Sequence, residues 1–206
     1  MTRAVTTIVP GDLDERGAYR LAMGVVVPRP IAWVATLNES GSVNLAPFSC
    51  YTAVSYSPFM VGINISPRAS GLKDTAANMV RSREFVLNVV HESQADAVHR
   101  SSEAMPPGVS EIEMLALATR PSDVVAPPRL ADAPAALECR LHDVIPFGDA
   151  GSQFYVGTVE VVHLREGLFR DGKVATAELE PLARIAGPNY ASIGRIQEFT
   201  DAFQRF

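Results

Sequence analysis

Apolar residues along this chain gather in short runs that turn residues separate. Ile31–Leu37 is a continuous apolar run of strand length. Leu137–His142 alternates, with Leu137, Cys139 and Leu141 on one face and charged residues on the other. Runs and alternations of this length, bounded by Gly, Pro, Asn and Ser, are typical of β-strands. Further strands are expected at 43–48, 52–55, 59–65, 85–90 and 154–164.

Helical patterns are few and short by comparison. We expect helices at 14–23, 74–81, 93–101 and 110–117. Many strands joined by turns favour a mainly β fold, an antiparallel β-barrel with peripheral helices, over a doubly wound sheet. Gly157, inside the expected strand 154–164, indicates close approach of another backbone or a ligand. The Pro-rich segment 127–134 lies between strands of similar character, so we interpret 1–206 as a single domain with a core at about 15–195.

Composition limits the classes of function. The chain has 206 residues with 47% hydrophobic content, enough for one good-sized core. Its net charge of −5 and the lack of a basic block argue against a nucleic-acid partner. The sequence has no run of transmembrane length and no signal-peptide pattern, so no membrane partner is expected. Cys50 and Cys139 are far apart in the sequence, which fits two buried free thiols in a reducing, cytoplasmic location.

The sequence offers no set of residues for hydrolysis or for metal binding. The four histidines are dispersed, and none lies in a nucleophile elbow or a His-Glu-x-x-His motif. His142 and His163 are expected to be solvent-facing or partnered structural residues. The acidic residues do not cluster as metal ligands, so no metal is expected. A bound cofactor would therefore carry the reactive step.

The segment 64–75 holds the most informative motif. An expected strand ends in a loop that contains Pro and Gly and carries Arg68 and Lys73, and a helical pattern follows at once from Asp74. The first turn of a helix has unpaired N–H groups and a partial positive charge, which suit a phosphate. Arg and Lys add formal charge and donors. The alternative is a surface loop with a capped helix.

A second polar cluster lies at 44–51. Ala46, Pro47 and Ser49 are small residues among apolar neighbours, and small side chains let a flat ring or a phosphate approach the backbone. Ser49 would donate to an anion. Taken alone, this segment favours an ordinary strand end with a hydroxyl that caps a turn.

These motifs occur in an order that resembles the flavin reductase-like proteins, which are FMN-binding split barrels. The resemblance rests on Arg29-Pro-Ile-Ala-Trp-Val-Ala-Thr36, Asn44-Leu-Ala-Pro-Phe-Ser49, Lys73-Asp-Thr75 with Asn78, and Glu84-Phe-Val-Leu-Asn-Val89. Later segments at 127–129, 136–139, 156–159 and 181–190 extend it over roughly 15–195. No single motif decides the matter, but the ordered set is specific.

The resemblance implies a homodimer with FMN in a groove near the dimer interface. It also implies that Asp74 caps the helix and does not touch the phosphate. Three groups of residues would form the site: Thr36, Ser49, Cys50 and Tyr51 along the flavin; Ser66, Arg68, Lys73 and Thr75 at the phosphate; and Arg184 and Tyr190 near the flavin or closing the site from a partner chain.

The implied function is an NAD(P)H-dependent FMN reductase. NADH or NADPH would pass a hydride to flavin N5, and the reduced flavin would serve a partner monooxygenase or another acceptor. The alternative is an FMN-binding electron-transfer or carrier protein without rapid turnover. Many short-chain flavin reductases have a His before the strand that corresponds to 154–161. Here that place reads Gly151-Ser-Gln153, which leaves efficient use of NAD(P)H open.

Overall fold

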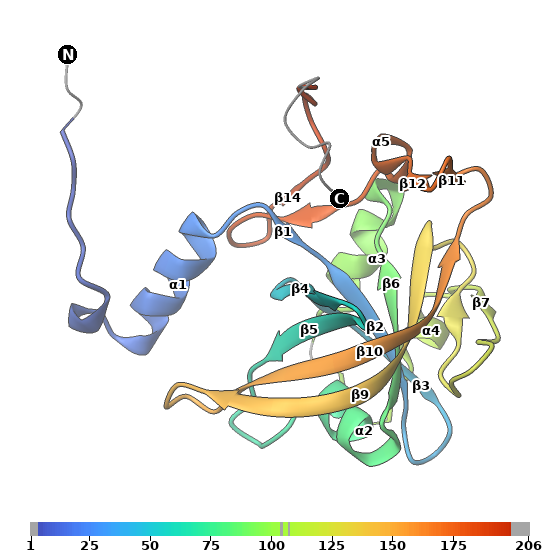
Figure 1. Ribbon diagram of the computed structural model, residues 1–206. Helices are drawn as coiled ribbons and strands as arrows, with labels where there is room; N and C mark the ends of the chain where they lie inside the picture. Colours follow the sequence, from blue (N-terminus) through green and yellow to red (C-terminus); the bar gives the residue numbers. More distant parts are fainter. Residues whose placement is uncertain (1–3, 104, 107, 199–206) are drawn as a thin grey trace.

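The computed structural model describes residues 4–103, 105–106 and 108–198, and its centre is one seven-stranded antiparallel sheet that curls into a barrel (Figure 1). The strand order is β3-β2-β6-β9-β10-β5-β4. The mainly β, antiparallel barrel expected from the sequence is therefore confirmed. The strands are β2 (Ala32–Leu37), β3 (Val43–Phe48), β4 (Tyr51–Tyr56), β5 (Phe59–Ile65), β6 (Glu84–Val89), β9 (Ala135–Phe147) and β10 (Ser152–Leu164).

The two edge strands of this sheet are consecutive in sequence, but they are not paired by backbone hydrogen bonds. β3 and β4 are the edge strands in the sheet order, yet only two residues, Ser49 and Cys50, separate them in sequence. The chain must therefore turn sharply at this corner, where one edge gives way to the other. The polar cluster noted at 44–51 lies at this corner.

Both faces of β2 are buried, which explains its continuous apolar sequence. Ala32 and Val34 belong to the core inside the barrel, together with Phe85 and Tyr155. Trp33 belongs to a second core on the outer face. That second core also contains Val98 of α3 (Ala95–Arg100), Ile112 of α4 (Glu111–Met114) and Leu182.

The peripheral helices lie where the sequence predicts them, but some of them differ from the prediction in length. α1 (Glu15–Val25) begins after Asp14, whose Oδ1 accepts a hydrogen bond of 2.7 Å from Gly17 N. α2 (Asp74–Ser82) matches its expectation closely. The helix expected at 93–101 divides into the 3-10 turn η2 (Glu92–Gln94) and α3. α4 ends at Met114, earlier than expected, and Ala116 then adopts a φ of 51° that a helix does not allow.

The remaining elements are short. They are η1 (Pro10–Asp12), β1 (Arg29–Pro30), β7 (Thr119–Arg120), β8 (Arg129–Leu130), β11 (Phe169–Arg170), β12 (Lys173–Val174), α5 (Thr176–Leu179), β13 (Ala183–Arg184) and β14 (Tyr190–Ala191). β1, β13 and β14 form a small separate sheet.

One sequence expectation about the long β9–β10 pair needs correction. Gly157 makes room for a core aromatic ring and not for a ligand or a backbone: a Cβ there would lie 2.4 Å from Cζ of Phe85. In the alternating segment 137–142, the Glu138 side chain on the charged face is completely buried.

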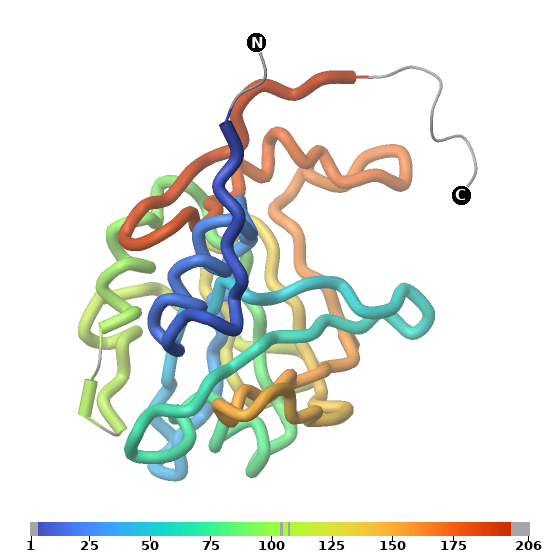
Figure 2. Tube along the Cα trace, turned by 90° about the vertical axis from the view of Figure 1, so that its left-hand side faces the viewer, coloured from blue at the N-terminus to red at the C-terminus, as the bar shows by residue number. Residues whose placement is uncertain are grey.

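α1 projects from one side of the barrel (Figures 1 and 2), and none of its residues is buried. The β4–β5 hairpin also extends beyond the body of the molecule in Figure 2, and Tyr56 near its tip is 92% exposed. Within the described residues, no helix combines the length and apolar character needed to span a bilayer.

Candidate functional site

Two neighbouring clefts lie at the corner between β3 and β4, and Pro47 and Ser102 line both of them. The first, which we call the loop cleft, has a volume of about 250 Å³ and is lined by Arg68 and Lys73. The second, the hairpin cleft, has a volume of about 470 Å³ and is bounded by the β13–β14 hairpin. Because they share lining residues, the clefts are two compartments of one surface depression.

The loop cleft brings two cationic side chains to the start of α2. Arg68 lies in a tight turn in which its N donates to Gly71 O at 2.8 Å and Gly71 N donates back at 3.0 Å. Lys73 is the N-cap residue of α2, and its Nζ lies 5.5 Å from the centre of the Phe48 ring. Burial, and secondarily the charge of Arg68, lowers the pKa of Lys73. An anion in the cleft would offset both effects.

The expected role of Asp74 as the helix cap is not observed. Lys73 occupies the N-cap position, no side chain caps the helix, and Asp74 is the first helical residue. The first-turn N–H groups of α2 therefore have no side-chain acceptor at the cap, as an anion-binding helix N-terminus requires. Asp74 itself lines the loop cleft beside the two cations.

A buried polar network fixes α2 against the sheet behind the loop cleft. Asn44 Nδ2 donates to Thr36 Oγ1 at 3.2 Å and to Thr75 Oγ1 at 2.9 Å. Asn78 Nδ2 donates to the same Thr36 oxygen at 3.1 Å. Thr36 is fully buried and lines neither cleft, so it supports the site from behind. Thr75 lines the loop cleft itself.

Glu111 is an acidic residue of the loop cleft that the sequence did not single out. Its Oε2 accepts a hydrogen bond of 2.8 Å from Leu45 N, and its side chain is buried. Burial raises the pKa of this carboxyl group; the charge of Asp74 adds to the rise, and the hydrogen bond from Leu45 opposes it. Protonation of Glu111 would remove one of the three acidic charges that line the cleft beside Arg68 and Lys73.

The hairpin cleft is organised around Tyr190. Arg184 and Tyr190 are paired across the β13–β14 ladder, and the guanidinium carbon lies 4.5 Å from the centre of the tyrosine ring. Arg184 Nη1 also donates to the tyrosine hydroxyl. His99 Nδ1 lies 3.1 Å from that oxygen, and the two rings are edge-to-face. The role of His99 was missed because 91 positions separate it from Tyr190.

Arg29 holds three segments together beneath the hairpin cleft. Its Nη1 donates to Met23 O at 2.7 Å and to Val26 O at 2.6 Å, and its Nη2 donates to Ile185 O at 2.8 Å. Its Nε approaches Ser49 Oγ at 3.4 Å. The side chain is 6% exposed, and carbonyl groups occupy its terminal nitrogens. Arg29 therefore positions α1, the hairpin and the β3–β4 corner relative to one another.

The structure places the predicted site residues unequally. The clefts are lined by Arg68, Lys73, Thr75, Ser49, Arg184 and Tyr190. Cys50 is partly buried and lines neither cleft. Tyr51 lines a separate apolar cavity of about 530 Å³, and burial raises its pKa. Ser66 is exposed, and its Oγ lies 2.9 Å from Ser152 Oγ. The roles of Thr36, Cys50, Tyr51 and Ser66 toward a flavin stay predictions.

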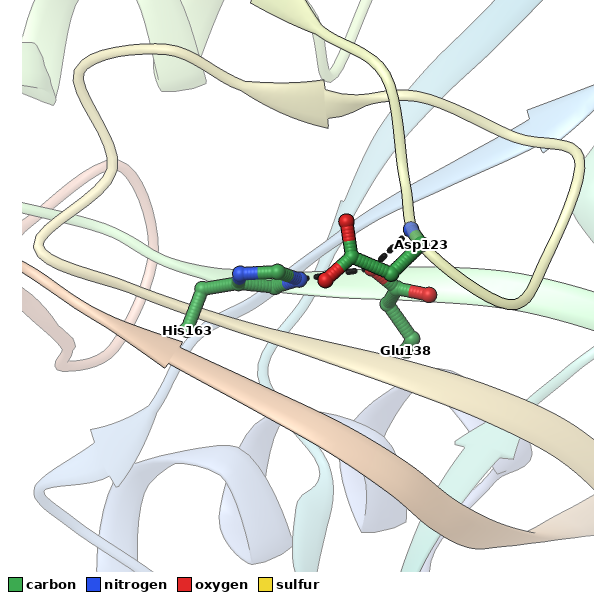
Figure 3. Close-up of side chains that lie close together, drawn as sticks. All are labelled: Asp123, Glu138 and His163. Atoms are coloured by element: carbon green, nitrogen blue, oxygen red, sulfur yellow. Dashed lines mark hydrogen bonds and ion pairs between the residues drawn. The ribbon is translucent and has the colours of Figure 1, made fainter.

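A second cluster of chemical groups lies away from the clefts (Figure 3). His163 Nε2 lies 2.6 Å from Glu138 Oε1, and Asp123 N donates to the same oxygen at 2.7 Å. Glu138 Oε2 accepts from Val124 N at 2.7 Å. Burial pushes the pKa of Glu138 up, but these hydrogen bonds outweigh burial and the pKa is lowered. Both carboxylate oxygens are occupied, so the cluster anchors the 123–124 loop to β9, and His163 is a partnered structural residue.

Comparison with known proteins identifies relatives over most of the chain. The family described as "Flavin reductase like domain" matches residues 23–182. An uncharacterised protein of Halalkalibacterium halodurans is 40% identical over 190 residues, which cover 90% of this chain and 91% of the relative.

Two solved structures share the fold at higher than 25% identity. Nitrilotriacetate monooxygenase component B from Bacillus cereus has a TM-score of 0.92 and 31% identity, over 96% of this chain and all of that one. The 2-nitrobenzoate 2-nitroreductase from Pseudomonas fluorescens has a TM-score of 0.86 and 30% identity, over 96% and 98% of the two chains. These likenesses, with the family match, support a flavin-related oxidoreductase function and a split-barrel fold.

Proposed function

Because the chain belongs to the flavin reductase-like family, we propose that it binds FMN across the two clefts and acts as an NAD(P)H-dependent flavin reductase. Bound FMN would supply the redox chemistry, as acceptor of a hydride at N5. The observation that carries the proposal is a cleft that holds Arg68 and Lys73 at a helix N-terminus, directly beside a larger cleft. That pairing suits a ligand with a phosphate at one end and a ring system at the other.

The residues of the loop cleft fit the phosphate end. Arg68 and Lys73 would supply charge-assisted hydrogen bonds, and the first-turn N–H groups of α2 would supply backbone donors. The Thr75 hydroxyl would donate as well, since its oxygen already accepts from Asn44. These are the donor types that hold phosphates in other proteins.

The corner residues fit the ring end. Pro47 and Ser49 line the hairpin cleft without large side chains, so a flat ring would reach the backbone there. Arg184 and Tyr190 line the same cleft, and His99 contacts the Tyr190 hydroxyl from behind them; this group would orient the nicotinamide. This assignment would replace the histidine that is missing at 151–153. Ser152 and Gln153 line neither cleft, because they contact Ser66 and Tyr155.

A homodimer is part of the proposal, and the uncovered apolar surface of one chain supports it. Val25 and Val26 at the end of α1 are 68% and 58% exposed, and the apolar cavity at Tyr51 opens nearby between Val27 and Ile193. A second copy would cover α1 and this cavity. Sedimentation equilibrium should give about twice the 22.2 kDa chain mass.

The destination of the electrons is the least specific part of the proposal. One similar structure is a monooxygenase component B, which supports delivery of reduced flavin to a partner monooxygenase. The other similar structure is a nitroreductase, which would instead use the bound flavin on a small acceptor. The carrier alternative, FMN bound without rapid turnover, differs from both in how fast NAD(P)H reduces the flavin.

One experiment separates a reductase from a carrier. The purified protein is mixed with FMN, and NADH or NADPH is then added without oxygen in a stopped-flow spectrometer. A reductase bleaches the flavin absorbance rapidly with one or both donors. Bleaching by dithionite but not by either donor would favour the carrier. Failure to bind FMN, FAD or riboflavin would overturn the proposed function.

A further inference from the structure

A further cavity, of about 890 Å³, lies on the other side of α3 from the hairpin cleft. Val98 and Ser102 face the hairpin cleft, whereas Gln94 and Ala97 line this further cavity. The other walls are the β7–β8 ribbon and the end of β10. None of its lining residues lines the loop or hairpin cleft, so it is a separate site. We call it the rear cavity.

Three arginines line the rear cavity without carboxylate partners. Arg120 and Arg129 are directly opposite in the β7–β8 ladder, a placement that is unfavourable for like charges. Arg165 donates through Nη2 to the carbonyl of Glu178. In the part of the chain that the structure describes, none of the three arginines is within salt-bridge distance of an acidic group.

Arg129 has a side-chain N–H group that lacks a hydrogen-bond acceptor. Its Nε is buried, and it is the one buried side-chain nitrogen or oxygen without a hydrogen-bond partner among the described residues. A buried N–H of a charged group that makes no hydrogen bond is costly, and such groups are rare unless water or an ion satisfies them. The buried Nε shows that this guanidinium is incompletely satisfied by the protein. An anion in the rear cavity would reduce the repulsion between Arg120 and Arg129, both of which line it.

The other charged groups of the cavity do not remove this need. His91 Nε2 lies 2.7 Å from Glu180 and His163 is bonded to Glu138, so both imidazoles already have partners. Asp132 and Glu166 also line the cavity, but both are exposed to solvent and neither pairs with an arginine among the described residues. The recognition set that remains is the three arginines.

We propose that the rear cavity binds a phosphate-bearing small molecule, with Arg120 and Arg129 holding the phosphate. Planar guanidinium groups match phosphate oxygens in a bidentate geometry. The cavity exceeds the size of an inorganic ion and falls in the range of small-molecule sites, so the ligand carries a further group beyond its phosphate. This site does not depend on the flavin function proposed above.

Isothermal titration of the full chain with pyrophosphate and with ADP tests this site. No FMN is added, because FMN itself carries a phosphate, and the Lys73→Ala variant is titrated in parallel to account for binding in the loop cleft. Arg120→Gln and Arg129→Gln should each weaken binding about tenfold or more. Arg100→Gln is the matched control, because Arg100 is exposed on α3 outside the cavity, and it should change affinity less than about twofold.

Several outcomes would overturn the proposal. Absence of binding at millimolar ligand would do so, as would binding that Lys73→Ala abolishes while the two rear-cavity variants retain it. Citrate is titrated as a tricarboxylate comparison, and binding of citrate without pyrophosphate or ADP would refute a phosphate ligand. Arg120 is exposed, so Arg120→Gln should keep the wild-type circular dichroism spectrum and remain interpretable if Arg129→Gln fails to fold.

Discussion

The loop cleft and the hairpin cleft touch, but they are built in opposite ways. Arg68, Lys73 and Thr75 of the loop cleft come from one short stretch, and the start of α2 positions them. Ser49, Tyr190 and His99 of the hairpin region come from three distant parts of the chain. A local motif therefore makes one half of the proposed site, and the path of the chain makes the other half.

The support behind the two clefts differs in the same way. Behind the loop cleft, Thr36, Asn44 and Asn78 are at most 6% exposed and are bonded to one another. The hairpin cleft instead stands on two-residue strands, and Arg184 and Tyr190 are only partly buried. We expect the loop cleft to be preorganised for a tightly bound group. We expect the hairpin cleft to bind a ligand that exchanges in each turnover.

Lys73→Ala should give the largest effect of the variants proposed here, and it should change the affinity for FMN only. Loss of a charge-assisted hydrogen bond costs about 1.5–3 kcal/mol, or about ten- to 150-fold in FMN affinity. The half-saturating NADH or NADPH concentration, measured at saturating FMN, should stay within about twofold. Fluorescence titration measures the first quantity, and stopped-flow reduction measures the second.

Riboflavin provides the internal control for Lys73→Ala because it lacks the phosphate. It should bind the variant and the wild type equally. Arg68→Ala should show the same pattern, since Arg68 lines the same cleft. If both variants bind FMN as tightly as the wild type, the phosphate lies outside the loop cleft and the proposed orientation is wrong.

Tyr190→Phe should change the NAD(P)H dependence and not the FMN affinity, and this effect should be smaller than that of Lys73→Ala. The change removes the hydroxyl that Arg184 and His99 contact, and it keeps the ring. A typical intramolecular hydrogen bond contributes about 0.5–1.5 kcal/mol net, and we expect that scale here because Arg184 and Tyr190 are only partly buried. The half-saturating NAD(P)H concentration should therefore rise about two- to tenfold. FMN affinity should not change. Tyr19→Phe is the matched control, because Tyr19 also lines the hairpin cleft and its hydroxyl makes no hydrogen bond to any residue that the structure describes.

The opposite result for Tyr190→Phe would be equally informative. A loss of FMN affinity with unchanged NAD(P)H dependence would place Tyr190 against the flavin. The proposal that Tyr190 in the hairpin cleft orients the nicotinamide would then be wrong. His99→Ala would still need to match Tyr190→Phe if the two residues act together.

The contrast between the clefts also explains what the sequence could predict. The strand, basic loop and helix at 59–82 are determined by neighbouring residues, so hydrophobic pattern and turn chemistry located them closely. Arg184 and Tyr190 came from family resemblance, because nothing local marks a two-residue strand. His99, Glu111 and the role of Arg29 depend on contacts across many positions, which a single sequence does not reveal.

The burial of Glu138 shows the same limit in the core. Alternation at 137–142 correctly separated the two faces of the strand. It could not show that the 123–124 loop covers one face and donates two backbone N–H groups to the carboxylate. A buried charge becomes acceptable when donors surround it, and those donors come from a loop without any pattern of its own.

Glu111→Gln should give the smallest effect, visible only as a difference in pH dependence. Ionised Glu111 would repel a phosphate in the loop cleft, whereas the protonated form would not. Wild-type FMN affinity should therefore fall relative to Glu111→Gln as pH rises through the raised pKa of this carboxyl group. The expected ratio is about two- to fivefold, as for a partly screened charge pair. The ratio cancels the titration of the phosphate itself, because both proteins bind the same ligand.

The stability of the same two proteins checks the sign independently of the ligand. Burial raises the pKa of Glu111 above its ordinary value of 4.5, so between the two values the folded chain keeps a proton that the unfolded chain has released. The folded state binds more protons there, and stability must fall as pH rises through this window. The free energy of unfolding of the wild type, measured with urea, should therefore fall relative to that of Glu111→Gln as pH rises from 4.5 through the raised pKa of this carboxyl group. A wild type that gains stability relative to Glu111→Gln over that range would mean that the hydrogen bond from Leu45 outweighs burial. Glu111 would then be a permanent negative charge in the loop cleft, and Lys73 and Arg68 would have to overcome it to hold a phosphate.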